Sequence, residues 1–410
     1  MPTPYLYTTA RQPLFKNLAP ELATPSLDVL YVTDRAPEDD SSGARRYGYE
    51  RSASAAYGRA RLEVGGDMSW AELVDYSTTP SPSLGRPRIR LDSVTELGRF
   101  PATPYLFRVD VPGRLELDPE VTAEREKALD EARRVLCDRL ASTPRKEVFL
   151  FVHGVGNSFE DAVRTAGEAW HFLGREGVPI AYTWPSGRGG LLFYAYDRES
   201  GEFTIFHLKQ LFNVLASTPE VERVHVLAHS RGTDVVMTAL RELVIETRAS
   251  GSDPRERFKI ENLILLAPDL DFEVVMQRLV AEALGPAFGR ITVYVNADDK
   301  AISAAQTLFH SRLRLGELEI SRLSEEQQAT LKQIANLDIV SYRGRIGGQF
   351  GHGYFRENQA VSSDLFARLR YGWLPGEGTR SGLERAGAGS NFWLIDDDNL
   401  RLWPLGETLQ

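Results

Sequence analysis

Short runs of apolar residues alternate with longer amphipathic segments from Glu147 onward, and this alternation is the feature that most constrains the fold. The runs are of strand length and almost continuously apolar, which is typical of strands buried on both faces of a parallel sheet. We expect strands at 147–153, 178–184, 223–229, 263–268, 291–296 and 337–342. Because helical spacing follows each run, the sequence predicts an α/β fold, with a mostly parallel central sheet and helices on both faces.

The segments between these strands predict the helices. The first begins with a capping box, in which Ser158 and Asp161 each accept a hydrogen bond from the other's backbone amide. We expect helices at 158–175, 204–215, 232–246, 272–284, 302–312, 324–335 and 358–370.

The first 145 residues have a different pattern. Apolar runs at 27–35, 57–64 and 105–111 are separated by loops rich in Pro, Ser and Gly, which indicates antiparallel strands at one edge of the same sheet. A separate small β domain is the alternative. A charged helix is expected at 113–141. We therefore divide the chain into an N-terminal segment (1–145), an α/β core (146–372) and a C-terminal extension (373–410) with "NFWLI" and "LRLWPL" as possible added strands.

Composition excludes several classes of protein. The chain has 42% hydrophobic and 26% charged residues, the balance of a globular protein. Its formal net charge of −9, without clustered Lys and Arg among aromatic residues, argues against nucleic acid as a partner. No apolar window reaches the length of a membrane span, so we expect a cytoplasmic protein, with export after removal of a leader left open. The single cysteine, Cys137, is expected in the core and excludes an intrachain disulfide.

The stretch "VHVLAHSRGTD" places Ser230 where an apolar strand is followed by a helix. A nucleophilic serine at such a turn needs small residues two before and two after it, and here these are Ala228 and Gly232. No other serine in the chain has Gly or Ala two before and Gly two after. Ser230 is therefore the candidate nucleophile, and the alternative is a plain turn in which Ser230 caps the helix.

A serine nucleophile needs a base to take its proton and a carboxylate to orient that base. Asp299, in the loop "ADDKA" that follows the strand "ITVYVN", is the preferred carboxylate; Asp298 is the reserve, with Asp269 and Asp271 as further alternatives. A carboxylate at a strand end can also simply cap a helix. His352, among the glycines of "GRIGGQFGHGYF", is the only histidine after the last parallel strand and is the candidate base.

Two backbone amides are expected to bind the oxyanion of the tetrahedral intermediate. These are the amide of Arg231, after the nucleophile, and the amide of Val155, in "FVHGVGNSF" after the first parallel strand. The segment "GRGGLLFYAYDRES" has the aromatic content of a pocket wall, although its side chains could equally pack the segment onto the sheet. The candidate pocket residues are Trp184, Phe193, Tyr194 and Tyr196.

Metal and cofactor sites are not expected. The chain has no HExxH motif and no His, Asp or Cys pairs at ligand spacing, so we predict no metal. It has neither a GxGxxG nor a GxxxxGK[ST] loop, and no cofactor is expected.

The strings "VLYVTDR", "YGYERS", "FVHGVGNSFEDAVRTAG", "TWPSGR", "YAYDRES", "VHVLAHSRGT", "LLAPDLD", "VYVNADDKAIS" and "FGHGYF" occur in this order. With these strings in this order, the chain resembles a bacterial family of α/β-hydrolase-fold proteins of unknown function, described as predicted serine esterases or lipases. The resemblance extends from about residue 27 to about residue 370. The resemblance implies the α/β-hydrolase fold, with nucleophile, acid and base at Ser230, Asp299 and His352. Similar sequences commonly carry Met where this chain has Arg231. That side chain either faces the pocket mouth, favouring anionic or polar substrates, or lies in a surface ion pair.

The sequence thus predicts a serine hydrolase that cleaves small-molecule carboxylic esters through an acyl-enzyme, with water as second substrate. One alternative is a catalytically silent α/β-hydrolase-fold binding or scaffold protein. The other is an amidase or peptidase that uses the same triad. The sequence makes no prediction of oligomeric state.

Overall fold

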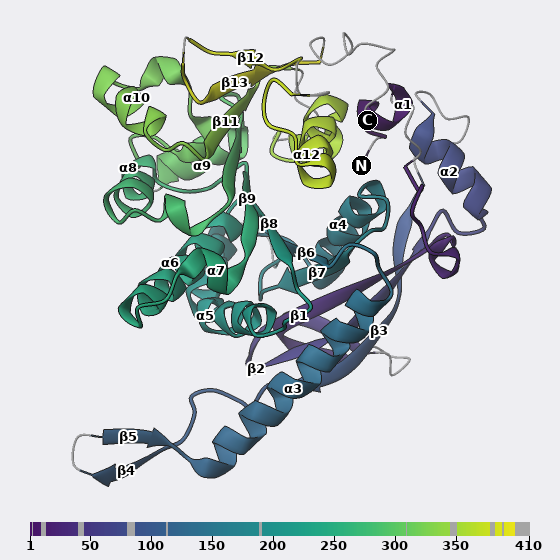
Figure 1. The fold of residues 1–410 in the computed structure, drawn as a ribbon, viewed down its shortest axis with the longest axis vertical. Coiled ribbons are helices and arrows are strands. Elements are labelled where there is room, and N and C mark those ends of the chain that lie inside the picture. The colour runs from purple at the N-terminus through teal and green to yellow at the C-terminus, as the bar shows by residue number, and fades with distance from the viewer. Residues whose placement is uncertain are drawn as a thin grey trace.

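The computed structural model describes residues 1, 3–9, 14–39, 45–79, 87–111, 114–187, 191–308, 310–344, 351–377, 382–387 and 389–397. Within them, one sheet has the strand order β12-β13-β11-β10-β9-β8-β6-β7-β1-β2-β3 (Figure 1). Its strands are β1 (Ser26–Asp39), β2 (Arg45–Val64), β3 (Ile89–Arg99), β6 (Glu147–Val152), β7 (Val178–Thr183), β8 (Arg223–His229), β9 (Ile260–Leu266), β10 (Arg290–Val295), β11 (Leu337–Tyr342), β12 (Glu384–Arg385) and β13 (Phe392–Ile395).

The centre of this sheet is parallel, from β1 across to β13. The six parallel strands expected from the sequence are β6 to β11, each within three residues of its predicted bounds. β2 and β3 continue the sheet antiparallel at one edge, and β12 does so at the other. The predicted fold class, a mostly parallel sheet with antiparallel N-terminal strands, is confirmed. The alternative of a separate β domain does not hold for β1 and β2, because β1 pairs directly with β7.

Helices cover both faces of the sheet. They are α1 (Tyr5–Thr9), α2 (Trp70–Thr78), α3 (Pro119–Ala141), α4 (Phe159–Phe172), α5 (Leu191–Ala216), α6 (Gly232–Ala249), α7 (Pro254–Phe258), α8 (Phe272–Val275), α9 (Lys300–Leu308), α10 (Glu325–Lys332), α11 (Tyr354–Glu357) and α12 (Gln359–Tyr371). Short 3-10 turns lie at Pro20–Leu22, Gly285–Ala287, Leu315–Glu317 and Ile320–Arg322, and a π-helical segment at Met276–Ala281.

Two hydrophobic clusters, one on each side of the sheet, hold these layers together. Along β6, Val148 and Leu150 belong to the cluster shared with α3, α5, α6 and α7, whereas Phe149 and Phe151 belong to the cluster shared with α1, α2, α4 and α12. Successive side chains of a strand point to opposite faces, so one apolar run supplies both cores. This is why the central strands are apolar at nearly every position.

Two helices differ from their predicted extent. α5 begins at Leu191, thirteen residues before the expected start at 204, so most of the segment read as a pocket wall is helical. Gly201 within it was no obstacle, because burial of residues such as Leu208 and Phe212 outweighs the helix propensity of one glycine, about 1 kcal/mol. The helix expected at 272–284 becomes α8 followed by the π-helical segment.

The prediction that 105–111 joins the sheet edge is wrong. This run forms β4 (Phe107–Val111), which pairs with β5 (Arg114–Leu117) in a separate hairpin, and helix α3 starts only at Pro119. Pairing with a neighbour a few residues away closes a short loop, which costs little entropy. The sheet edge is taken instead by β3, which the sequence pattern did not reveal because its exposed and half-buried residues include many charged ones.

Smaller points concern the two ends of the chain and its cysteine. "NFWLI" contains β13, as expected, whereas "LRLWPL" lies outside the described residues. The prediction of a core position for Cys137 is wrong: the thiol is only partly buried on α3, where it donates to Glu220 Oε2 at 3.3 Å. In the described part of the chain, no helix combines the length and apolar character needed to cross a membrane.

Candidate active site

Ser230 lies on a tight turn between β8 and α6, in the middle of the sheet. Its φ of +53° is in the left-handed region, which a residue with a side chain enters at a cost of about 1–2 kcal/mol. The turn is held by hydrogen bonds from the Ser230 amide to Leu266 O, 2.9 Å, and from Thr233 Oγ1 to Ser230 O, 2.6 Å. A serine held at a strand end in a strained turn matches the turn expected from the sequence, although Ser230 is only 5% exposed.

The small residues around Ser230 are required by space. A Cβ on Gly232 would lie 2.3 Å from His153 O, and a Cβ on Gly154 would lie 2.6 Å from the Cβ of Ser230. Both distances are far below van der Waals contact, so the backbone after β6 approaches the serine turn as closely as it does only because these positions are glycine. The loop after β6 and the nucleophile are therefore packed directly against each other.

Asp299 and His352 form a hydrogen-bonded pair, with 2.7 Å between Asp299 Oδ2 and His352 Nδ1. Asp299 follows β10 and is completely buried, and its Oδ1 accepts from the amides of Ala301 and Ile302 at the start of α9. One carboxylate oxygen is thus fixed by the helix and the other faces the imidazole. Asp298 is exposed on the surface and does not take this place.

His352 contacts His229, the residue before Ser230. The two imidazole rings are 4.7 Å apart, and His229 Nε2 donates to His352 O at 3.3 Å. Burial and the neighbouring His352 hold the pKa of His229 well below its usual range, so this ring stays neutral. His229 therefore supports the backbone of the candidate base and is not a second base.

The loop after β6 is fixed by His153, whose ring is buried and stacks on Trp184 with 5.1 Å between ring centres. His153 Nδ1 donates to Gly154 O at 2.8 Å, and Nε2 accepts from the Trp184 amide at 3.1 Å. Burial, with Arg35 nearby, lowers the pKa of His153 to about 3, so the ring is neutral. Trp184 itself is completely buried in the core, beneath the loop.

Arg35 ties this loop to the N-terminal strand β1. Its guanidinium donates to Thr183 Oγ1 and to the carbonyls of Gly48, Ser186 and Asn157, at 2.7 to 2.9 Å. Burial lowers the pKa of Arg35 to about 10, so it remains charged at neutral pH. A single buried side chain thus joins three separate stretches of chain around the loop.

Two residues that hold this loop, Arg35 and Asp197, were not predicted from the sequence, although both lie in strings that carry the family resemblance. Arg35 ends "VLYVTDR", and Asp197 lies in "YAYDRES". Asp197 accepts from the Gly156 amide at 3.0 Å and from Ser186 Oγ at 2.8 Å. For Arg35 the available signal was a charged residue within an apolar strand, since such residues are buried only when they are paired; Asp197 lies within α5 and gave no such signal.

The Arg231 side chain lies in an ion pair, 2.7 Å from Asp234, and is nine-tenths buried. Asp234 also approaches Arg278, 3.4 Å away. Arg231 further lines a surface cavity of about 380 Å³, so the two alternatives drawn from the sequence are both present in part. The cavity is lined by Arg198, Glu202, Arg231, Asp234, Leu270, Asp271, Val274, Arg278, Ser311 and Arg314.

The remaining candidates are placed as follows. Tyr194 donates to Asp269, which also pairs with Arg314 at 2.6 Å and whose amide donates to Ser230 O, so Tyr194 lies near the serine turn. Asp269 is thereby engaged away from His352, and Asp271 caps α8. Tyr196 turns toward β2, donating to Tyr49 O at 3.1 Å. The side chain of Phe193 lies outside the described part.

Within the part of the chain that the structure describes, no three His, Cys, Asp or Glu side chains are grouped so that they could hold a metal ion.

The parallel sheet with a serine turn after a central strand defines an α/β hydrolase. Residues 128–369 match the model of the family described as alpha/beta hydrolase of unknown function (DUF900), and the chain belongs to that family. No curated protein matches the sequence significantly.

Several solved structures are similar to this chain. Acyl-protein thioesterase 2 from Zea mays is 13% identical, covers 55% of this chain and 94% of its own, and has a TM-score of 0.31. Est1E from Butyrivibrio proteoclasticus, solved with ferulic acid bound, is 13% identical, with coverages of 56% and 89% and a TM-score of 0.31. An esterase from Pyrobaculum calidifontis is 13% identical, covers 65% of this chain and 95% of its own, and has a TM-score of 0.28. Because these identities and TM-scores are low, nothing about the activity of this chain follows from them.

Proposed function

We propose that this α/β hydrolase is a serine esterase that cleaves carboxylic esters through an acyl-enzyme. The observation that carries the proposal is the Asp299–His352 pair, 2.7 Å apart, held by His229 against the strained turn of Ser230. A buried carboxylate hydrogen-bonded to one nitrogen of an imidazole orients the other nitrogen and stabilises the cation that forms when it takes a proton.

The proposed reaction has two halves. Because Asp299 accepts a hydrogen bond from Nδ1–H of His352, Nε2 is left unprotonated and takes the proton of Ser230 as its oxygen attacks the ester carbonyl. His352 then gives this proton to the departing alcohol, leaving an acyl group on Ser230. Water attacks the acyl-enzyme in the second half, again with His352 as base, and releases the acid and free Ser230.

Two backbone amides, of Val155 and Arg231, would hold the oxyanion. The amide of Arg231 follows the nucleophile at the start of α6. For Val155, the support is the orientation of the peptide bond between Gly154 and Val155. Gly154 O accepts from His153 Nδ1, and in a trans peptide the N–H of Val155 points the opposite way from this oxygen. Each such donor is worth a few kcal/mol of transition-state stabilisation.

The cavity lined by Arg231 supports a polar substrate. Seven of its ten lining residues carry a charged side chain, four basic and three acidic. A long acyl chain gains affinity from apolar surface, about 25 cal/mol for each Å² buried, and would find little of it here. We therefore favour short or polar esters as the substrate class.

A fluorophosphonate probe tests the proposal. The wild-type protein should become covalently labelled, with a mass increase on the peptide that carries Ser230, and Ser230→Ala should stay unlabelled. The reason is that the probe reacts only with a hydroxyl that a neighbouring base has activated. If folded wild-type protein takes up no label, the esterase proposal is wrong and a binding or scaffold role is favoured.

A second prediction concerns His153 as a positioning residue. His153→Phe keeps a ring against Trp184 but loses the 2.8 Å hydrogen bond to Gly154 O. Only the longer contacts of this oxygen with Asn157 Nδ2 and Ser186 Oγ, both 3.4 Å, then remain, so the Val155 amide should be held less firmly in direction. We expect kcat to fall about ten- to a hundredfold, with KM little changed, in steady-state ester hydrolysis.

His225→Phe is the matched control for this prediction. His225 is also buried and stacked, 4.8 Å from the ring of Phe149, but it lies within β8 and contacts Glu147 at the start of β6. This variant should lose stability and keep kcat. An equal fall in kcat for both variants would mean that His153 acts only through overall stability.

A further inference from the structure

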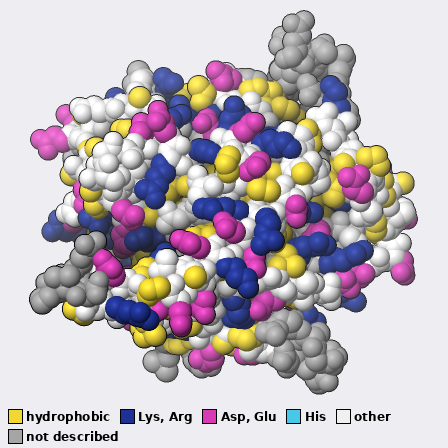
Figure 2. Space-filling view, turned by 60° about the horizontal axis from the view of Figure 1, so that its bottom comes forward, with side chains coloured by type: hydrophobic (Ala, Val, Ile, Leu, Met, Phe, Trp, Pro, Cys, Tyr) yellow, Lys and Arg dark blue, Asp and Glu magenta, His cyan; other side chains and the backbone are white. Residues whose placement is uncertain are grey.

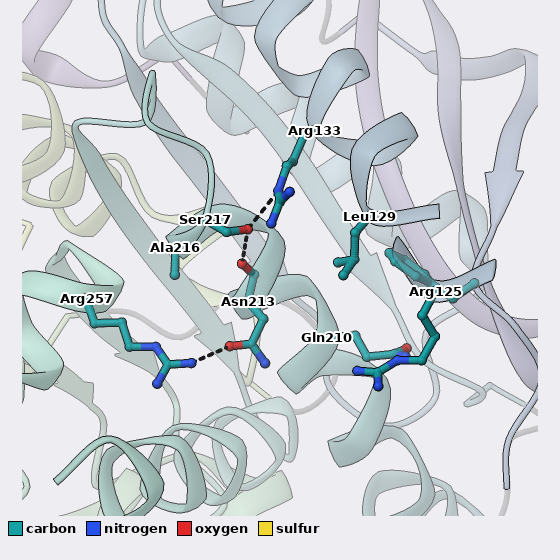
Figure 3. Close-up of a pocket in the computed structure, with 9 residues that line it drawn as sticks. Arg125, Leu129, Arg133, Gln210, Asn213, Ala216, Ser217 and Arg257 are labelled. Atoms are coloured by element: carbon teal, nitrogen blue, oxygen red, sulfur yellow. Dashed lines mark hydrogen bonds between the residues drawn. The ribbon is translucent and has the colours of Figure 1, made fainter. Parts of the chain in front are cut away.

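A second pocket, of about 350 Å³, lies between α3, α5 and α7. Figure 3 shows Arg133, Arg125 and Arg257 pointing toward Asn213 and Gln210 of α5 from different sides. It is lined by Phe100, Arg125, Leu129, Arg133, Gln210, Asn213, Ala216, Ser217 and Arg257, and none of these residues is acidic.

The guanidinium groups in this pocket have mostly uncharged neighbours. Arg257 donates to Asn213 Oδ1 at 3.3 Å and to Thr247 Oγ1 at 3.2 Å, and Arg125 lies over the ring of Tyr105, 5.0 Å from its centre. Among the described residues, no carboxylate forms an ion pair with the guanidinium group of Arg125 or Arg257.

Only the third, Arg133, has such a partner. It lies 2.9 Å from the exposed carboxylate of Asp130 and also donates to Ser217 Oγ at 3.0 Å. Three cations with one exposed counter-charge give the pocket an excess of positive charge, which would favour an anion in it.

This excess of positive charge is confined to the pocket. The chain carries a net charge of −9, and Figure 2 shows Lys and Arg interspersed with Asp and Glu over the face turned toward the viewer. No attraction from the protein as a whole would bring an anion here. The recognition has to come from the three guanidinium groups at short range.

The pocket is separate from the candidate active site. Ser217 lies before the start of β8, and Ser230 follows its end, so the strand stands between them. At about 3.3 Å per residue, the seven residues of β8 span roughly 20 Å. A molecule in this pocket therefore does not reach Ser230, and is not a substrate in place for hydrolysis.

We propose that this pocket binds a phosphate ester. A tetrahedral phosphate offers several oxygens, and planar guanidinium groups bind such oxygens in pairs of parallel hydrogen bonds. The side-chain amides of Gln210 and Asn213 add neutral donors at the wall. Phe100 and Leu129 provide an apolar side for the organic part of the ester.

The phosphate could be carried by a soluble molecule or by a lipid headgroup, because an exposed apolar surface lies beside the pocket. Tyr105, which contacts Arg125, leads into the β4–β5 hairpin that projects beyond the start of α3 (Figure 1). Phe107 pairs with Leu117 and Val109 with Leu115, which puts these apolar side chains on one face. Phe107, Val109 and Leu115 are 53%, 66% and 67% exposed.

Calorimetric titration with glycerol phosphate tests the site, and cosedimentation with phosphatidylcholine vesicles, with and without phosphatidic acid, tests the lipid source. The wild type should bind at least one probe. The double variant Arg125→Gln, Arg257→Gln should bind that probe about a hundredfold more weakly, since each lost charge-assisted hydrogen bond is worth about a factor of ten. Arg134→Gln, on the same helix but 72% exposed and outside the pocket, should bind normally.

The outcomes separate the sources. Binding of glycerol phosphate with no effect of phosphatidic acid on cosedimentation identifies a soluble ligand. Cosedimentation that requires phosphatidic acid and is lost in Phe107→Ser, Val109→Ser identifies a lipid headgroup. If no probe binds, or if the double arginine variant binds as tightly as the wild type while its circular dichroism is unchanged, the proposal is overturned.

Discussion

Ser230→Ala is expected to lower kcat for a short p-nitrophenyl ester by about 10⁶-fold. Without the hydroxyl no acyl-enzyme can form, and His352 and Asp299 have no nucleophile to activate. The residual rate should still exceed that of the uncatalysed reaction, by about 10³-fold, because backbone amides and substrate positioning remain. Stopped-flow and steady-state measurements on the purified variant give the comparison, with attention to trace wild-type contamination.

Removal of this hydroxyl should leave the fold intact. In the alanine variant, the backbone of residue 230 keeps its hydrogen bonds to Leu266 and Thr233, and alanine tolerates the left-handed turn about as well as serine. Ser362→Ala, which removes another buried serine hydroxyl on α12, should retain full activity. A Ser230→Ala protein that hydrolyses the ester at the wild-type rate would show that the reaction proceeds elsewhere.

The architecture of the core was predictable because it depends on one strong signal. A run such as "EVFLFV" is apolar at successive positions, and only a strand covered on both faces can bury all of them. Edge strands lack this signal: β3 has no buried face along most of its length, and Phe107 and Val109 pair locally in a hairpin and remain exposed. Their placement depends on tertiary contacts that a local pattern does not contain.

The candidate site was predictable where a residue's place in the chain decides its place in space. Ser230 directly follows β8 and Asp299 lies four residues after the end of β10, and parallel strands bring their carboxyl ends to one edge. What the chain order does not reveal is the direction of a side chain: whether Asp298 or Asp299 points inward, or that His229 packs against His352, 4.7 Å away. The buried guanidinium of Arg35 likewise depends on four partners from distant segments.

Asp299→Asn is expected to lower kcat by about 10⁴-fold while leaving the structure nearly unchanged. The amides of Ala301 and Ile302 donate to Oδ1, so the asparagine oxygen should stay with them and its NH₂ group should face His352. The Nδ1 atom would then accept a hydrogen bond, and the proton of the neutral imidazole would move to Nε2. In that tautomer Nε2 cannot take the proton of Ser230, which is the same loss that an incorrectly protonated base causes in any such triad.

Asp298→Asn is the matched control, because it makes the same chemical change one residue earlier on an exposed side chain. It should leave kcat and KM near their wild-type values. Asp299→Asn should also regain part of its activity as pH rises, since hydroxide can then replace the missing base. Equal rates for the wild type and Asp299→Asn at neutral pH would remove the carboxylate from the proposed mechanism and leave Ser230 and His352 to act without it.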